Sequence, residues 1–194
     1  MSKIECNIVD SVSGTSTLTL GSSNALTITK ASGVNANFAG VKVAGMWRIN
    51  TGTSLSADTE TTVTAGWEEV DTDSYTRIGS AMSESSGVWT FPETGIYQIN
   101  WNVQFKSPSQ GATKATSIIS VTPDNSTYST ATDNSGNIYH SNGRASVLSS
   151  HIFDVTNTST HKCKLNALCE FACTLHSATE QSRTWVQFIR LGDT

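Results

Sequence analysis

The clearest pattern in the chain is a strict alternation of apolar and polar residues from position 97 to position 106. One side carries Tyr97, Ile99, Trp101, Val103 and Phe105, and the other carries Gln98, Asn100, Asn102, Gln104 and Lys106. A period of two predicts a strand over 96–106 with one face buried and the other in water. The segment FPETG just before it, at 91–95, predicts a turn.

Shorter apolar segments predict further strands on both sides of this one. They lie at 41–49, 59–67, 88–91, 115–121, 145–155 and 183–191. A second long alternating strand is expected over 161–175, whereas the polar stretch 122–143 predicts a long exposed hairpin or loop. No long segment of the sequence has its apolar residues spaced with the period of a helix. Eight to ten strands with turns between them predict an all-β sandwich or jelly roll.

The N-terminal part of the chain differs from the remainder. Over 1–44, pairs of apolar residues such as Leu18 and Leu20 are separated by turns rich in Gly, Ser and Asn. Strands with two apolar residues bury too little surface to be stable alone. We therefore expect 1–44 to be a β-rich segment that trimerises or docks on another protein, with a flexible tail as the alternative, and 45–194 to be the globular domain.

The composition supports strands and excludes several partners. The chain has 28 Ser and 28 Thr among 194 residues, only 14% charged residues and a net charge of −4. No run of Lys and Arg is present, so nucleic-acid binding is not expected. No apolar run is long enough for membrane insertion, and the N-terminus lacks the pattern of a signal peptide. We expect synthesis and assembly in a cytoplasm.

The four cysteines predict no metal centre. They are Cys6, Cys163, Cys169 and Cys173, and the last three share one face of the strand expected over 161–175. Neighbours on one face of one strand are poorly placed for a disulfide, so we interpret them as small buried residues. Zinc would need paired ligands spaced across a turn. A disulfide to a neighbouring strand or subunit stays open.

The sequence contains no convincing catalytic pattern, and no enzyme or cofactor is expected. His140, His151, His161 and His176 form no recognisable triad, and no G-x-S-x-G motif is present. The acidic residues at 68, 69, 71 and 73 are interpreted as a solvated loop, with paired carboxylates of a glycosidase as the alternative. Calcium could bind there or at Asp124 with Asp133 and Asn134, but the spacing of a calcium loop is absent.

Residues Phe91-Pro92-x-x-Gly95-x-Tyr97 resemble a motif of the C1q and tumour-necrosis-factor-like jelly rolls, and the chain ends, as in that family, on a strand rich in Trp and Phe. The resemblance covers about 45–194. It implies a C1q/TNF-like jelly roll that forms a homotrimer. It also implies core or trimer-contact roles for Tyr97, Trp101, Trp185 and Phe188. The chain lacks the Gly-X-Y stalk of animal C1q proteins.

The segment STLTLGSSNALTIT at 16–29 looks like the N-terminal region of small fibre-like structural proteins of tailed bacteriophages. This resemblance implies a virion protein, a tail fibre or spike or a capsid fibre or decoration. Residues 1–44 would attach it to other virion proteins, and the head would contact a host-surface glycan or protein. The candidate contact residues are Tyr128, Tyr139 and His140, and the loop at 79–87 is a further candidate contact region. Alternatives are a soluble C1q-like recognition module and a tailspike glycosidase.

Overall fold

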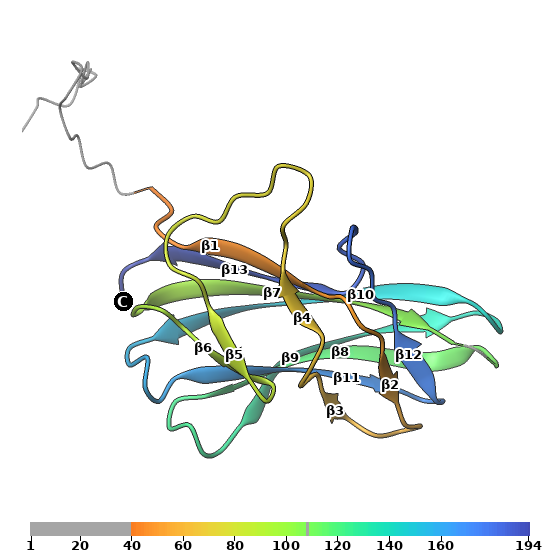
Figure 1. Ribbon diagram of the computed structural model, residues 1–194. Helices are drawn as coiled ribbons and strands as arrows, with labels where there is room; N and C mark the ends of the chain where they lie inside the picture. The colour runs from red at the N-terminus through yellow and green to blue at the C-terminus, as the bar shows by residue number, and fades with distance from the viewer. Residues whose placement is uncertain (1–39, 108) are drawn as a thin grey trace, which may run out of the picture. The chain divides into compact units, whose positions relative to one another are not determined.

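A computed structural model describes residues 40–107 and 109–194 of the chain. Two antiparallel sheets face each other across one hydrophobic core (Figure 1). Residues Ala39–Thr194 form one compact unit. The segment expected over 1–44 lies outside the described residues as far as position 39, so its predicted role stays a prediction. The predicted boundary at 44 falls on the first residue of the first strand.

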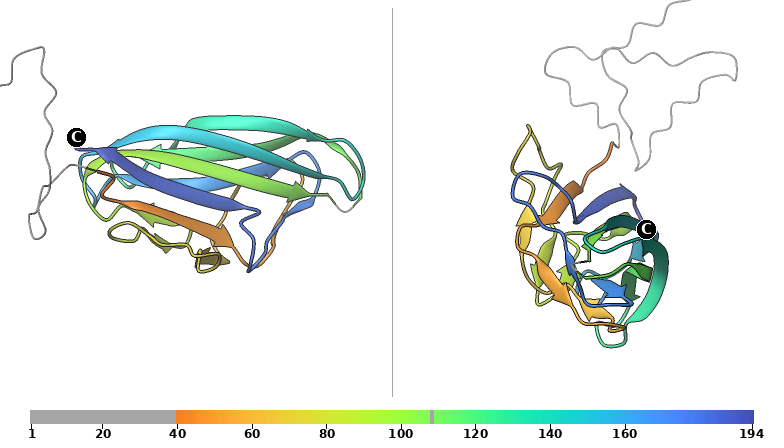
Figure 2. Two further views of the ribbon diagram at one scale, coloured as in Figure 1. Left: turned by 90° about the horizontal axis from the view of Figure 1, so that it is seen from above. Right: turned by 90° about the vertical axis from the view of Figure 1, so that its right-hand side faces the viewer.

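Sheet A contains the long strand at 95–106. Its order is β2-β12-β7-β13-β1-β4, and β10 pairs with the other edge of β7. The strands are β1 (Ala44–Ile49), β2 (Thr53–Leu55), β4 (Trp67–Glu69), β7 (Gly95–Lys106), β10 (Arg144–Val155), β12 (Cys173–Leu175) and β13 (Trp185–Gly192). Figure 2, at left, looks onto this sheet and shows β10, β7, β13 and β1 side by side.

Sheet B covers the other side of the core. Its order is β5-β6-β11-β8-β9, and β3 pairs with β11. The strands are β3 (Thr61–Thr62), β5 (Ser83–Ser85), β6 (Val88–Thr90), β8 (Ala112–Thr122), β9 (Ser129–Ile138) and β11 (Lys162–Cys169). All pairs of adjacent strands in both sheets are antiparallel, and the described residues contain no helix. The all-β sandwich that the sequence predicts is confirmed.

The predicted amphipathic strand is confirmed as β7, which lies between β10 and β13. Its five apolar side chains, from Tyr97 to Phe105, are all fully buried. They meet a cluster of tryptophans in which Trp67 and Trp89 have ring centroids 5.0 Å apart. Trp101 also crosses the core, because its indole Nε1 donates to the Asn166 carbonyl of β11 at 2.9 Å. This bond joins the two sheets.

Three predicted elements are wrong in detail. The strand expected over 59–67 is only the short pieces β3 and β4. The stretch 122–143 contains the ten-residue strand β9, which is polar because it is an edge strand with most side chains in water. The strand expected over 161–175 is interrupted at 170–172, where the chain leaves sheet B as β11 and enters sheet A as β12.

Candidate functional site

The outward face of sheet A combines exposed apolar side chains with an uncharged polar stripe. On β10, Leu148 and Ile152 are 46% and 60% exposed. Cross-strand pairing places Leu148 beside Asn102, and Asn102 beside Trp185. Two residues on either side of a common partner lie on one face of an antiparallel sheet. The face therefore has apolar flanks on β10 and β13 and a central stripe of amides on β7.

The amide stripe satisfies its own hydrogen bonds. Asn100 Nδ2 donates to Gln187 Oε1 at 3.2 Å, and Ser150 Oγ donates to Asn100 Oδ1 at 2.8 Å. Gln98 Nε2 donates to the same oxygen at 3.3 Å. Polar groups that are already paired within the sheet cost less to remove from water than free ones. This face is thus suited to being covered by another protein surface.

The candidate interface or core residues divide between the two faces of sheet A. Tyr97, Trp101 and Phe188 are fully buried within the sandwich of a single chain. Trp185 is half-buried and lies on the outward face in register with Asn102. Of the four residues, only Trp185 is placed where a second chain could touch its side chain.

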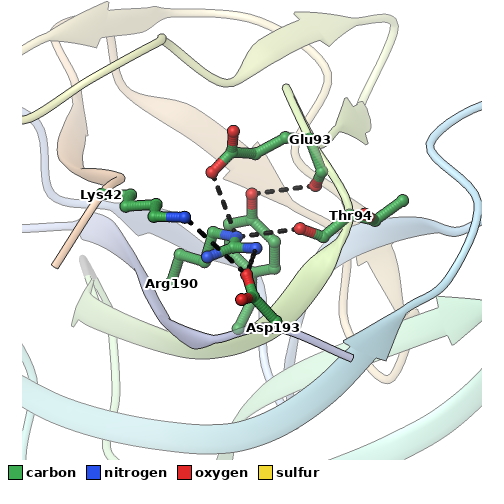
Figure 3. Close-up of polar contacts among 6 residues, drawn as sticks. Lys42, Glu93, Thr94, Arg190 and Asp193 are labelled. Carbon is green, nitrogen blue, oxygen red and sulfur yellow. Dashed lines mark hydrogen bonds and ion pairs between the residues drawn. The ribbon is translucent and has the colours of Figure 1, made fainter. Parts of the chain in front are cut away.

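The motif at 91–97 forms a binding site for the side chain of a buried arginine, a contact that the sequence did not reveal. Figure 3 shows Glu93, Thr94 and Asp193 around the guanidinium of Arg190, which is only 7% exposed. Its Nε donates to the Thr94 carbonyl at 2.8 Å and lies 3.1 Å from Glu93 Oε1, and its Nη2 donates to Asp193. Gly95 has φ +148°, and a Cβ there would lie 2.3 Å from Arg190 Nε. Glycine is therefore required at this position.

Tyr97 closes the same structure from inside. Its hydroxyl donates to the Glu93 carbonyl at 3.0 Å, and its ring lies 4.8 Å from that of Phe91. Burial first, and the Glu93 carboxylate second, raise the pKa of Tyr97 to about 12. The hydrogen bond with Asp193 is the main cause that raises the pKa of Arg190. The motif thus fixes the end of β7 against the chain's last strand.

Three of the four acidic residues at 68, 69, 71 and 73 form ion pairs with arginines. Arg48 is 1% exposed, and its Nη2 lies 2.7 Å from Asp71 Oδ1 and 3.4 Å from Glu68 Oε1. Glu69 forms an ion pair with Arg77. The interpretation of this run as a solvated loop holds for Asp71 and Asp73, which are exposed, but not for Glu68 and Glu69, which lie in β4 and are partly buried.

The candidate contact residues lie at the two ends of β9. Tyr128 precedes the strand, and the amino group of Lys164 lies 4.1 Å from its ring centroid. Tyr139 follows the strand and is 89% exposed, and His140 beside it is exposed too. Ten residues of strand separate the ends by roughly 30 Å. A shallow pocket next to Tyr139 is lined by Gly111, Ala112, Thr113, Asn137 and Ile138.

The cysteines occupy a place that the sequence did not predict. Cys163, Cys169 and Cys173 are free and buried. Because β11 ends at Cys169 and β12 begins at Cys173, these two residues are not neighbours on one strand. Their thiols form a hydrogen bond, which is the main cause that lowers the pKa of Cys169. Burial raises the pKa of the Cys163 thiol.

Within 40–107 and 109–194, no group of three or more His, Cys, Asp or Glu side chains is arranged to hold a metal ion. Asp124, a candidate calcium ligand, instead accepts from the Thr122 hydroxyl and from the backbone N–H groups of Ser126 and Thr127. These hydrogen bonds, with that from Thr122 the largest cause, lower its pKa. No helix that could cross a membrane is found in the same ranges.

Solved structures show the same fold at low sequence identity. Murine APRIL is 17% identical, with a TM-score of 0.56 over 77% of this chain and 98% of that protein. The Eiger TNF of S. frugiperda is 12% identical, with a TM-score of 0.59 over 79% of this chain and 95% of its own. No protein-family model matches the sequence, and no curated protein matches it significantly. The fold is thus a C1q/TNF-like jelly roll, as the motif at 91–97 predicts.

Proposed function

We propose that the chain is a bacteriophage virion structural protein that assembles as a homotrimer and displays its jelly-roll head for attachment to a host surface. The observation that carries the proposal is the outward face of sheet A, which is uncharged along its centre and apolar along its flanks. The resemblance of the N-terminal segment to phage fibre proteins supports the virion role, and the C1q/TNF-like fold supports a trimeric head.

The composition of this face favours self-association. From Gln98 to Gln104 on β7, and from Ser146 to Ile152 on β10, no outward side chain is charged. Depletion of charge and enrichment of aromatic and aliphatic groups distinguish the centre of protein interfaces from ordinary surface. Leu148 and Ile152 would lose their exposure to water on association, at a gain of roughly 25 cal/mol for each Å² of apolar area buried.

A trimer would present three copies of each loop at the ends of the sandwich. Tyr139 and His140 lie in the loop that leads from β9 of sheet B to β10 of sheet A, and they are free to touch a ligand. Three weak contacts made together bind much more tightly than one, because the second and third become intramolecular. A host-surface glycan or protein is the proposed ligand. A soluble C1q-like recognition module is the alternative, and it would use the same face and the same loops outside a virus.

Imaging purified virus particles tests the virion role. Antibody raised against the full chain is expected to label particles at projecting densities with threefold symmetry, and antibody against residues 1–39 is expected to label their base. Particles without the polypeptide, together with full binding of the purified chain to cells, would instead support the soluble module. Hydrolysis of host polysaccharide that disappears in a Glu68→Gln/Glu69→Gln variant would overturn the proposal in favour of a glycosidase.

A further inference from the structure

One end of sheet A gathers positive charges that are far apart in the sequence. Lys106, the last residue of β7, pairs directly with Arg144, the first residue of β10. Both side chains are exposed and lie on the outward face of the sheet. Like charges directly opposite each other across two strands destabilise a sheet. The fold nevertheless keeps this pair.

Two more nitrogen-rich side chains, His176 and Arg183, reach the same place from the loop between β12 and β13. The backbone N–H of His176 donates to the Gln104 carbonyl at 2.7 Å, two residues before Lys106. Its ring Nδ1 lies 2.6 Å from Gln104 Oε1, and its Nε2 lies 3.2 Å from Arg183 Nη1. A neutral ring that donates from Nδ1 and accepts at Nε2 satisfies both contacts. The charges of Arg144, Arg183 and Lys106 all act on this ring.

In the part of the chain that the structure describes, Lys106, Arg144 and Arg183 have no acidic partners. Among residues 40–107 and 109–194, the cations that form ion pairs with carboxylates are Lys42, Arg48, Arg77 and Arg190. Lys106, Arg144 and Arg183 form none with a carboxylate of the same residues. Arg183 also has a buried Nε without a hydrogen-bond partner. In a chain of net charge −4, three unpaired cations around one histidine are a local concentration of positive charge.

We propose that Lys106, Arg144, Arg183 and His176 form a binding site for an oxyanion, either free in solution or carried as an acidic group on a saccharide. An oxyanion there would accept charge-assisted hydrogen bonds from the guanidinium groups and the ammonium group. It would also relieve the repulsion between Lys106 and Arg144. All four side chains come from a single chain, so one chain holds every residue of the site, and Lys106 and Arg144 lie just beyond the uncharged stretch that the trimer is proposed to cover.

The site has a built-in dependence on pH. Burial first, then the charges of Arg144, Arg183 and Lys106, lower the pKa of His176, so its ring is neutral at pH 7. Acidification adds a fourth positive charge and converts Nε2 into a donor. By linkage, an anion that binds the protonated ring better must bind more tightly as the pH falls. Sulfate is the suitable probe because its own charge does not change near neutral pH.

Isothermal titration of the full chain with inorganic sulfate, in a low-salt buffer free of phosphate, tests the proposal. Lys106→Gln/Arg144→Gln is expected to weaken sulfate binding by about tenfold or more, since hydrogen bonds to charged groups contribute about 1.5–3 kcal/mol each. The control is Lys114→Gln, which removes an exposed charge on β8 and should leave the affinity within about twofold. Circular dichroism melting of each variant checks that it is folded.

Dextran sulfate and uncharged dextran distinguish the two sources of the anion. Tighter binding of dextran sulfate than of inorganic sulfate, lost in Lys106→Gln/Arg144→Gln, indicates a saccharide ligand, and equal binding indicates a free ion. Sulfate affinity should rise from pH 7 to pH 5, and His176→Asn should remove that rise. Absence of sulfate binding, or an equal loss in Lys114→Gln, would overturn the proposal.

Discussion

Replacing Gly95 by alanine removes the empty space in which the Arg190 guanidinium lies. The new Cβ would be 2.3 Å from Arg190 Nε and 2.7 Å from the Gly192 carbonyl oxygen. Both are far inside van der Waals contact, and a φ of +148° is a backbone conformation that side chains rarely adopt. The Arg190 side chain must therefore move away from Gly95 and Thr94, because a backbone carbonyl cannot move as readily as a side chain.

The cost arises from the contacts that Arg190 loses. Its Nε donates to the Thr94 carbonyl at 2.8 Å, and a buried hydrogen bond from a charged donor contributes about 1.5–3 kcal/mol. Strain at an unfavourable φ adds about 1–3 kcal/mol. The ion pairs with Glu93 and Asp193 add little, because both carboxylates are exposed. Gly95→Ala should thus lower the free energy of unfolding by about 2.5–6 kcal/mol, the sum of the two contributions.

Urea unfolding followed by tryptophan fluorescence measures this loss, at one fixed protein concentration because association would shift the midpoint. Gly192→Ala is the matched control, since a Cβ at Gly192 meets no atom within 4 Å. It should change the stability by less than about 0.5 kcal/mol. In an Arg190→Ala background, Gly95→Ala should lower the free energy of unfolding only by the strain of the backbone at position 95. A loss below about 1 kcal/mol for Gly95→Ala in the wild-type background would refute the proposed role of the motif.

Three further predictions concern buried polar groups. The folded-state pKa of Tyr97, about 12, lies above the ordinary value of 10.0, so the contribution of its hydroxyl to stability is complete below pH 10 and disappears as the pH rises towards 12. Urea unfolding at pH 9 and at pH 12 should therefore show that the free energy of unfolding falls less between these pH values for Tyr97→Phe than for the wild type. Arg48→Gln should lower the free energy of unfolding by about 3 kcal/mol, because it leaves the half-buried Glu68 without its cation. The double variant Arg48→Gln/Glu68→Gln should recover part of this loss, and equal losses in the single and double variants would contradict the pairing of Arg48 with Glu68. Trp101→Phe should cost about 2 kcal/mol in thermal unfolding, since the Asn166 carbonyl loses its donor across the core, and a neutral effect would mean that the bond contributes nothing to joining the sheets.

The strands that alternate cleanly could be predicted because one face of each is buried. β7 alternates over its whole length, and its five buried side chains are those that the pattern assigns to the core. β9 could not be recognised, because an edge strand that is wet on most positions has no apolar period. The interruption between β11 and β12 was hidden as well, since Glu170, Phe171 and Ala172 are not turn-forming residues and Cys169 and Cys173 keep the alternation across it.

The sites depend on tertiary contacts that no local pattern contains. The motif at 91–97 indicates the fold, but its partner Arg190 lies almost a hundred residues further along the chain and resembles any charged residue on a strand. The basic cluster leaves no run of Lys and Arg in the sequence, because pairing of β7 with β10 is what brings Lys106 and Arg144 together. Tyr139 was predicted as an exposed residue and is exposed, whereas Tyr128 lies against Lys164 at the other end of β9.

The mass of the full chain in solution, from size-exclusion chromatography with light scattering, tests the central claim of a trimer formed through the outward face of sheet A. The wild type should have about three times the 20.7 kDa of one chain. Leu148→Lys/Ile152→Lys should shift the mass towards that of one chain, because it places charges in the proposed interface. Tyr139→Lys, in the exposed loop between β9 and β10, should leave the trimer intact. A wild-type mass of one chain, or a trimer unaffected by Leu148→Lys/Ile152→Lys, would contradict the claim.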